Sequence, residues 1–176
     1  ATKKDKGALD AWIERVGQEE ADRIKNEASR VGTYLHEVIE RMVAYRDLPR
    51  PTNWEMCKGY EMGYKIINTY FRNVSEIWGS EVSLFYPERY AGTTDLVGVY
   101  RDKPAIIDFK QSNKPKKRQW IEDYFCQLAA YALAHDALHG TNIDNAVVLM
   151  AVRSDGSTAE FSTAGREFQG YKDMWL

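Results

Sequence analysis

The sequence predicts an α/β domain with a mixed central β-sheet, a meander of strands at its core and helices on its flanks. Three observations lead to this fold class. Apolar residues at helical spacing fill the first part of the chain, strand-like segments joined by a tight turn follow, and one more helical segment precedes a last pair of strands. With 176 residues, 44% of them hydrophobic, the chain suffices for one domain with a buried core. We expect a single domain over 1–176, made of a helical lead-in (8–74), a sheet with one helix (80–152), and a C-terminal hairpin with a short helix (153–176).

The helical lead-in divides into three predicted helices. The first covers 8–30, with Gly17 as a candidate break. The second follows Thr33, which is a suitable N-cap, and ends before the prolines that begin at Pro49. The third runs from about 54 to 74.

The spacing of apolar residues changes after residue 80. Segments bounded by turn residues have the composition of strands: 81–86, 93–100 and 105–110. The remaining predicted elements are a helix over 119–138, strands over 146–152 and 158–161, and a short helix in the last ten residues.

Charge and cysteine content narrow the function classes. A formal net charge of −2 argues against a protein that coats nucleic acid, but not against one that concentrates carboxylates at a metal site. The 2 cysteines, Cys57 and Cys126, argue against a disulfide framework and exclude a four-cysteine cluster within the chain. No apolar run approaches the ~20 residues of a membrane-spanning helix, and residues 1–6 lack the apolar core of a secretory signal. We therefore expect an intracellular, cytoplasmic protein without a membrane partner.

Two acidic residues should meet on the predicted hairpin. A tight turn between 93–100 and 105–110 brings Asp95 opposite Asp108 or its neighbour, and Lys110 projects from the same strand face as Asp108. Adjacent carboxylates repel each other, and a divalent cation such as Mg²⁺ offsets that repulsion. A strand end that has simply reached solvent is the competing interpretation, and this motif alone leaves it open.

Polar residues at helical spacing supply further candidates. His36 and Glu40 are four apart and share a helix face, whereas Glu37 lies on another. Gln127 and Tyr131 repeat that spacing on the predicted helix 119–138. The competing interpretation of the first pair is a hydrogen-bonded structural histidine. For the second pair it is a polar residue and an aromatic residue that flank the apolar face of the helix.

In their order along the chain, these motifs resemble the RecB-type branch of the PD-(D/E)XK nucleases, which includes phage exonucleases and mitochondrial genome-maintenance exonucleases. The matching residues are Gly32-Thr33-x-x-His36-x-x-x-Glu40, Gly92-x-x-Asp95, Asp108-Phe109-Lys110 and Gln127-x-x-x-Tyr131. The resemblance extends from about residue 8 to residue 152. It implies the restriction-endonuclease-like PD-(D/E)XK fold, with the catalytic residues on the sheet and helix of 80–152.

The resemblance also implies a role for each matched residue. The implied metal ligands are His36, Asp95, Asp108 and the backbone carbonyl of Phe109. Lys110 would orient the attacking water or stabilise charge on the phosphate. Gln127 and Tyr131 would support the site and contact the DNA backbone. Supporting positions are implied for three glutamates, which are Glu37, Glu40 and Glu81.

The strongest basic segment, KQSNKPKKR over 110–118, directly follows the predicted catalytic strand. We expect a phosphate backbone to enter beside its basic residues, which are Lys114, Lys116, Lys117 and Arg118. Trp120 is a candidate for stacking on an unpaired base, and a core anchor for the following helix is the alternative.

The resemblance implies a DNA exonuclease that uses one or two Mg²⁺ or Mn²⁺ ions and no iron–sulfur cluster. Single-stranded DNA or free DNA ends are the expected substrates, in DNA processing, recombination or degradation, with a recombination or replication protein as an expected partner. If the chain is encoded by a phage, its place would be the host cell cytoplasm. The alternatives are a structure-specific endonuclease of the same fold and a catalytically inactive DNA-binding module.

Overall fold

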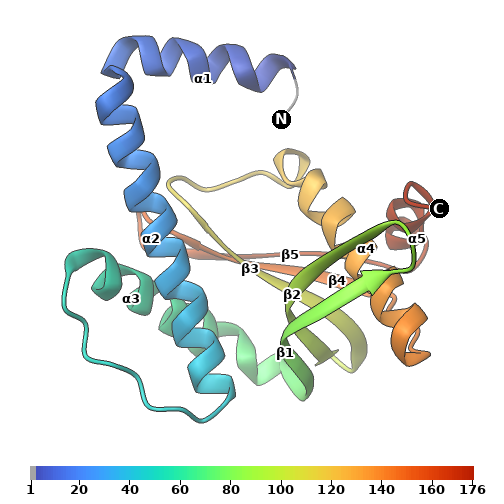
Figure 1. Ribbon diagram of the computed structural model, residues 1–176. Helices are drawn as coiled ribbons and strands as arrows, with labels where there is room; N and C mark the ends of the chain where they lie inside the picture. Colours follow the sequence, from blue (N-terminus) through green and yellow to red (C-terminus); the bar gives the residue numbers. More distant parts are fainter. Residues whose placement is uncertain (1–2) are drawn as a thin grey trace.

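The computed structural model describes residues 3–176, and the side chains from residue 7 onward. A five-stranded sheet in the order β1-β2-β3-β4-β5 separates two helical layers, with α2 and α3 on one face and α4 and α5 on the other (Figure 1). The strands are β1 (Val74–Tyr86), β2 (Tyr90–Tyr100), β3 (Lys103–Ser112), β4 (Asn145–Val152) and β5 (Thr158–Ala164). The helices are α1 (Lys3–Val16), α2 (Gln18–Val43), α3 (Trp54–Tyr70), α4 (Glu122–His139) and α5 (Gly165–Asp173), with short 3₁₀ helices at Phe71–Asn73 and Arg118–Trp120.

The sheet is mixed, as the sequence predicts. β1, β2 and β3 form an antiparallel meander, β3 and β4 are parallel, and β5 runs antiparallel to β4. Parallel neighbours need a long crossover connection, which the segment containing α4 supplies. The predicted α/β class with flanking helices is therefore confirmed. No helix in the described part of the chain combines the length and apolar character needed to cross a bilayer.

The β2–β3 hairpin has the register on which the predicted site depends. Residues 101–102 form its two-residue turn, and both have positive φ (49° and 62°), which suits the right-handed twist of the flanking strands. The ladder ends with Leu96 paired to Ile107. The next residue on each strand is an aspartate, so Asp95 and Asp108 face each other beyond the last pair.

Hydrophobic cores lie on both faces of the sheet because the side chains of β3 and β4 alternate between two apolar layers. Ile107 and Leu149 face the layer of α2 and α3, whereas Ile106 and Val148 face the layer of α4 and α5. Strands that are buried on both faces need apolar residues at every position, which explains the continuous apolar runs. Charged residues within such strands consequently need a specific explanation.

The N-terminal helices agree with their prediction at Gly17 and differ from it at Gly32. The predicted break at Gly17, with φ 87°, separates α1 from α2, but α2 then continues through Gly32 and Thr33 without a break. Thr33 is therefore not an N-cap; its hydroxyl donates to the Ser29 carbonyl within the helix at 3.1 Å. A glycine inside a helix costs about 1 kcal/mol relative to alanine. At Gly32 the missing side chain makes room for Gln111, whose amide nitrogen would lie only 3.3 Å from a Cβ at this position.

Two element ends also differ from expectation. The third helix ends at Tyr70 and passes into a 3₁₀ turn, and β1 begins at Val74 rather than at residue 81. The first half of β1 is mostly exposed and contains two register shifts against β2, one between Ile77 and Gly79. An edge strand that is solvated on both sides lacks the alternation that identifies strands in a sequence.

Candidate active site

The two aspartates lie side by side where β2 and β3 leave their common ladder. The backbone N–H of Phe109 donates a hydrogen bond to Asp95 Oδ2 at 2.7 Å, which ties Asp95 across to β3. Asp108 is only 5% exposed. Burial, aided by the charge of Asp95 and opposed by Lys110, raises the pKa of Asp108 to about 6. A buried carboxyl group whose anion is destabilised in this way is typical of a functional site.

Lys110 is the cation nearest to Asp108. Its Nζ donates to Asp108 Oδ1 at 2.8 Å and lies 2.8 Å from Oδ2. Burial lowers the pKa of Lys110, but the carboxylates of Asp108 and Asp95 outweigh burial, so that the pKa is raised. The ion pair thus favours the charged form of Lys110. Asp108 lies deeper, and there the effect of burial on the pKa exceeds that of the ion pair. The ammonium group also lies 5.2 Å from the ring centroid of Tyr124.

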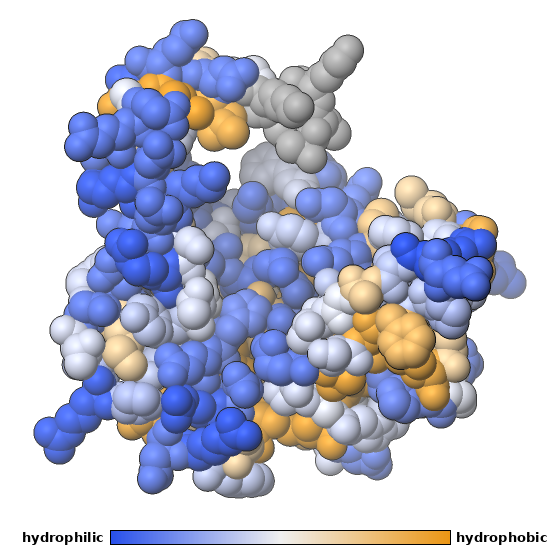
Figure 2. Space-filling view, viewed as in Figure 1, coloured by the Kyte–Doolittle hydropathy of each residue, from blue (hydrophilic) through white to orange (hydrophobic). Residues whose placement is uncertain are grey.

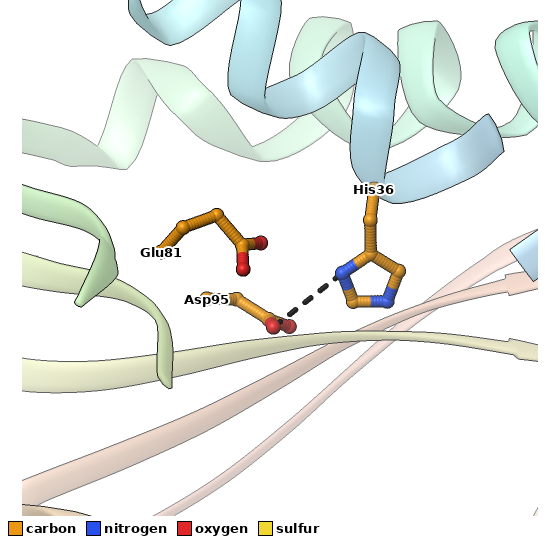
Figure 3. A group of neighbouring side chains, drawn as sticks. All are labelled: His36, Glu81 and Asp95. Atoms are coloured by element: carbon orange, nitrogen blue, oxygen red, sulfur yellow. Dashed lines mark ion pairs between the residues drawn. The ribbon is translucent and has the colours of Figure 1, made fainter. Parts of the chain in front are cut away.

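His36 lies on α2 and points toward Asp95 (Figure 3). Its Nδ1 lies 3.4 Å from Asp95 Oδ1. Burial lowers the pKa of the imidazole, yet Asp95 and then Asp108 outweigh that effect, and the pKa is raised. The ring also packs edge-on against Phe109, with centroids 6.3 Å apart.

Glu81 on β1 lies closer to the centre than its predicted supporting role suggests. One ligand atom each from His36, Glu81 and Asp95 lie within 4.8 Å of one another, and all three side chains point toward a common space (Figure 3). Glu81 has φ 51°, a left-handed conformation that costs a residue other than glycine roughly 1–2 kcal/mol. Burial and the neighbouring Asp95 raise its pKa. Strained backbone of this kind clusters at functional sites.

His36, Glu81 and Asp95 lie in a groove with a volume of about 730 Å³. The other two predicted glutamates line the α2 side of this groove. Glu37 is held by Arg41 Nε at 3.1 Å and by the Tyr60 hydroxyl at 3.4 Å. Among the residues whose side chains are described, Glu40 pairs with Arg46 alone, at 3.9 Å. Hydrophilic side chains predominate over α2 on the face shown in Figure 2, whereas hydrophobic ones gather around β1, β2 and α4. The groove therefore suits a charged ligand.

The donor set fits a hard divalent cation. Carboxylate oxygens from Asp95, Asp108 and Glu81 and an imidazole nitrogen from His36 are suitable ligands for Mg²⁺ or Mn²⁺. Asp108 Oδ2 is buried and accepts no hydrogen bond of favourable geometry from the described residues, although the Lys110 ammonium forms an ion pair with it at 2.8 Å. A buried charge is costly unless it is both paired and hydrogen-bonded. A divalent cation beside Asp108 would add to the compensation that one lysine provides. Phe109, whose carbonyl the resemblance adds to the ligands, lies between Asp108 and Lys110 on β3.

The structure places Gln127 and Tyr131 together on α4. Gln127 Nε2 donates to the Tyr131 hydroxyl at 3.2 Å. The Tyr131 ring covers Gly92, where a Cβ would lie 2.6 Å from a ring carbon. The glycine of the Gly92-x-x-Asp95 motif is therefore required by close packing. In the described structure neither side chain hydrogen-bonds to the carboxylates, so their catalytic role stays a prediction.

The basic segment after β3 divides into an anchored residue and exposed ones. Arg118 is tied to Glu167 at 2.7 Å and lies 4.8 Å from the ring centroid of Phe125. Trp120 is 56% exposed, which excludes the core-anchor interpretation, and Lys117 Nζ lies 5.6 Å from its ring centroid. The remaining predicted phosphate contacts are exposed, namely Lys114 and Lys116.

Sequence reasoning missed two residues beside Lys110. Tyr124 has no assigned role in the sequence analysis, yet its ring centroid lies 5.2 Å from the lysine ammonium. Gln111 donates to the Ala28 carbonyl of α2, and so joins β3 to the helix that holds His36. The glycine within the apolar helical pattern at Gly32 was the available signal, because close approach of another group is one reason for a glycine in a helix.

Known proteins resemble this chain in sequence and in fold. The model of the PD-(D/E)XK nuclease superfamily matches residues 7–169. Mitochondrial genome maintenance exonuclease 1 of Xenopus tropicalis is 30% identical over 134 residues, which cover 73% of this chain and 37% of that protein. The human protein of the same name is 27% identical over 169 residues, covering 90% and 47%. The chain thus spans less than half the length of these curated relatives.

A solved structure supports the fold independently. The crystal structure of a candidate exonuclease from Eubacterium rectale matches with a TM-score of 0.57 at 13% sequence identity, covering 84% of this chain and 63% of that one. At this identity the likeness concerns the fold alone.

Proposed function

Because the chain belongs to the PD-(D/E)XK nuclease superfamily, we propose that it is a metal-dependent deoxyribonuclease that degrades DNA from free ends. One observation carries the proposal: Asp95, Asp108 and Lys110 converge at the end of a hairpin, and the Asp108 carboxylate is buried there beside a second carboxylate. The choice of an exonuclease is supported by the similarity to two proteins named as exonucleases.

Members of this superfamily use divalent metal ions, and we propose Mg²⁺ or Mn²⁺ for this chain. His36, Glu81 and Asp95 would hold the ion, because one ligand atom of each lies within 4.8 Å of the others, and Asp108, which follows the last β2–β3 pair opposite Asp95, would join them. When bound, such an ion lowers the pKa of a coordinated water and neutralises charge on the phosphate.

The side chains of the chain provide the remaining chemistry. Lys110 keeps a positive charge 2.8 Å from the Asp108 carboxylate, where it can donate a hydrogen bond to the attacking water or to a phosphate oxygen. A preorganised cation at the position where negative charge develops stabilises the transition state. Asp95 is fixed by the Phe109 N–H and needs no rearrangement before the reaction. Phosphodiester hydrolysis is therefore the reaction that this geometry supports best.

DNA degradation by the purified protein tests the proposal. End-labelled single-stranded, duplex and circular DNA are incubated with Mg²⁺, Mn²⁺ or EDTA, using the intact protein beside Asp108→Asn and Lys110→Ala. Asp102→Asn makes the same chemical change at the turn of the same hairpin and is the matched control. We expect metal-dependent loss of linear DNA in the intact protein and the control, and none in the two site variants.

Each outcome decides between the candidate functions. Cleavage of circular DNA would replace the exonuclease by a structure-specific endonuclease of the same fold. Binding of DNA without any cleavage would favour an inactive DNA-binding module. Activity that survives Asp108→Asn would remove Asp108 from the catalytic centre.

A further inference from the structure

A second groove begins where the catalytic strand ends. It has a volume of about 440 Å³ and is lined by residues 111–116 together with Trp120 and Tyr124. Ligand pockets for small organic groups have volumes of roughly 300–1,000 Å³. The groove is therefore large enough for one nucleoside.

Tyr124 joins this groove to the catalytic centre. Its ring lies 5.2 Å from Lys110 Nζ, and the same side chain forms part of the groove wall. A nucleoside in the groove would consequently lie beside the group that we assign to the scissile phosphate.

Trp120 supplies an aromatic surface that the fold itself does not use. The side chain is 56% exposed, and its described contact is with Lys117, whose Nζ lies 5.6 Å from the ring centroid. Stacking on such a ring suits any base, because every base has a π face. Hydrophobic anchoring of the chain does not explain the position of Trp120.

The loop that shapes the groove is held at both ends. At its start, the backbone N–H groups of Arg153 and Ser154 donate to the carbonyls of Ser112 and Asn113, at 2.8 and 3.1 Å. At its end, Arg118 is paired with Glu167 on α5. The aromatic surface therefore needs little ordering before a ligand binds, which lowers the entropic cost of binding.

We propose that this groove binds one unpaired nucleotide of the DNA substrate, adjacent to the scissile phosphate, with its base stacked on Trp120 and its sugar beside Tyr124. The proposal rests on the proposed nuclease function and adds a substrate class to it. A base in a duplex is stacked on both faces and paired along one edge, so it cannot stack on Trp120. The groove therefore selects single-stranded DNA or frayed ends. The exposed Lys114 and Lys116 on the groove wall contact the flanking phosphates.

A scan with abasic oligonucleotides tests the subsite. Single-stranded substrates carry one abasic residue that is moved stepwise through the nucleotides nearest the cleaved end. Cleavage is measured with Mg²⁺, and binding is measured by fluorescence anisotropy in EDTA. In the intact protein, an abasic residue at one position should raise KM and Kd on the order of 10- to 100-fold, the range of base–aromatic stacking.

Three variants show whether Trp120 causes this penalty. Trp120→Ala should lose the positional penalty, Trp120→Phe should keep much of it, and Trp78→Ala should behave as the intact protein. Trp78 is a matched control because it is 42% exposed on β1, outside the groove. An abasic penalty that is unchanged in Trp120→Ala, or absent at every position, would overturn the subsite. If the intact protein cleaved no DNA at all, the nuclease function would be refuted instead. The binding scan in EDTA would still report on the groove.

Discussion

The β2–β3 hairpin and helix α2 both contribute residues to the site, but they hold them by different physical means. In the hairpin, a two-residue turn fixes the register, and the register alone places Asp95 opposite Asp108. His36 belongs to a helix that is distant in sequence and meets Asp95 only through packing between layers. Local backbone geometry determines the first arrangement, and a few side-chain contacts determine the second.

This difference separates chemical from geometric effects of substitution. Changes at Asp108 or Lys110 remove a group to which we assign a ligating or charge-stabilising role, while the strands keep their register. Changes at the contact between Gly32 on α2 and Gln111 on β3 leave every ligand present and alter only their relative position. We therefore expect large effects in the hairpin and smaller ones at the helix contact.

The largest effect is expected for Asp108→Asn. The amide keeps the shape of the side chain but loses the negative charge that holds a cation. Metal catalysis contributes several kcal/mol of transition-state stabilisation, so kcat should fall by at least about 10³-fold. Calorimetric titration with Mn²⁺ should show weakened binding at the same time. Full metal affinity in the variant would contradict the assignment of Asp108 as a ligand.

Lys110→Ala should reduce kcat by about 10²- to 10³-fold, which is the effect of removing one preorganised charge-stabilising group. Metal affinity should stay close to that of the intact protein, because Lys110 is not a ligand. Single-turnover cleavage measures the rate, and Mn²⁺ titration measures the affinity. Lys110→Arg keeps the charge, and it should recover part of the rate if electrostatics rather than shape is decisive. A large loss of metal affinity in Lys110→Ala would instead show that the ammonium group organises the ligands.

Asp108 should also make the metal-free protein less stable at neutral pH. Its pKa is raised from 3.8 to about 6 by burial and by Asp95, so the folded state binds the proton more tightly than the unfolded chain. The stabilising contribution is complete below pH 3.8 and is lost as the pH rises through about 6. The loss is roughly 3 kcal/mol in the free energy of unfolding.

Urea unfolding in EDTA at several pH values measures this contribution as the difference between the intact protein and Asp108→Asn. In the variant, the free energy of unfolding should not show the decrease between pH 4 and pH 7 that Asp108 causes in the intact protein. Mg²⁺ should stabilise only the intact protein at neutral pH. If the free energy of unfolding changed with pH in the same way in both proteins, the ionisation of Asp108 would not destabilise the folded state.

The same contrast explains how much of the molecule could be predicted from its sequence. The hairpin register follows from the position of one turn, so the convergence of Asp95, Asp108 and Lys110 was predictable. The crossover helix and the buried strands follow from periodicity. The extent of α2 was not predictable in this way, because tertiary contact at Gly32 overrides the low helix propensity of glycine.

Long-range contacts account for the site residues that sequence reasoning missed or undervalued. Glu81 enters the ligand cluster because its backbone adopts a positive φ that its residue type does not suggest. Tyr124 meets Lys110 because the chain reverses between β3 and α4. Neither arrangement leaves a periodic signal in the sequence.

A double-mutant cycle tests the contact that joins α2 to β3. In Gly32→Ala the new Cβ would lie 3.3 Å from the Gln111 amide nitrogen, so the Gln111 side chain must give by a few tenths of an ångström, which disturbs its contact with α2. Metal affinity should fall about tenfold, since displaced supporting contacts typically cost 10- to 100-fold. In a Gln111→Ala background, Gly32→Ala should have no such effect and should stabilise the helix by up to about 1 kcal/mol.

Gly170→Ala in α5 is the matched control, because no atom lies within 4 Å of its added Cβ. It should change neither metal affinity nor activity. Additive effects of Gly32→Ala and Gln111→Ala, with a coupling free energy near zero, would show that the contact does not set the position of His36.

The smallest effect concerns the loop that continues β3 beyond the site, where exposed and anchored basic residues should differ. Lys116→Ala should reduce the slope of log Kd against log salt by about 0.7, the value for one phosphate contact on single-stranded DNA. Arg118→Ala should change that slope less, because its guanidinium is already paired with Glu167 and packed on Phe125. It should instead lower the free energy of unfolding by about 1 kcal/mol. Lys103→Ala, at the opposite end of β3, controls for net charge.

Equal slopes for Lys116→Ala and Arg118→Ala would mean that Arg118 exchanges Glu167 for phosphate when DNA binds. The loop would then move to close on the DNA rather than form a fixed wall of the groove.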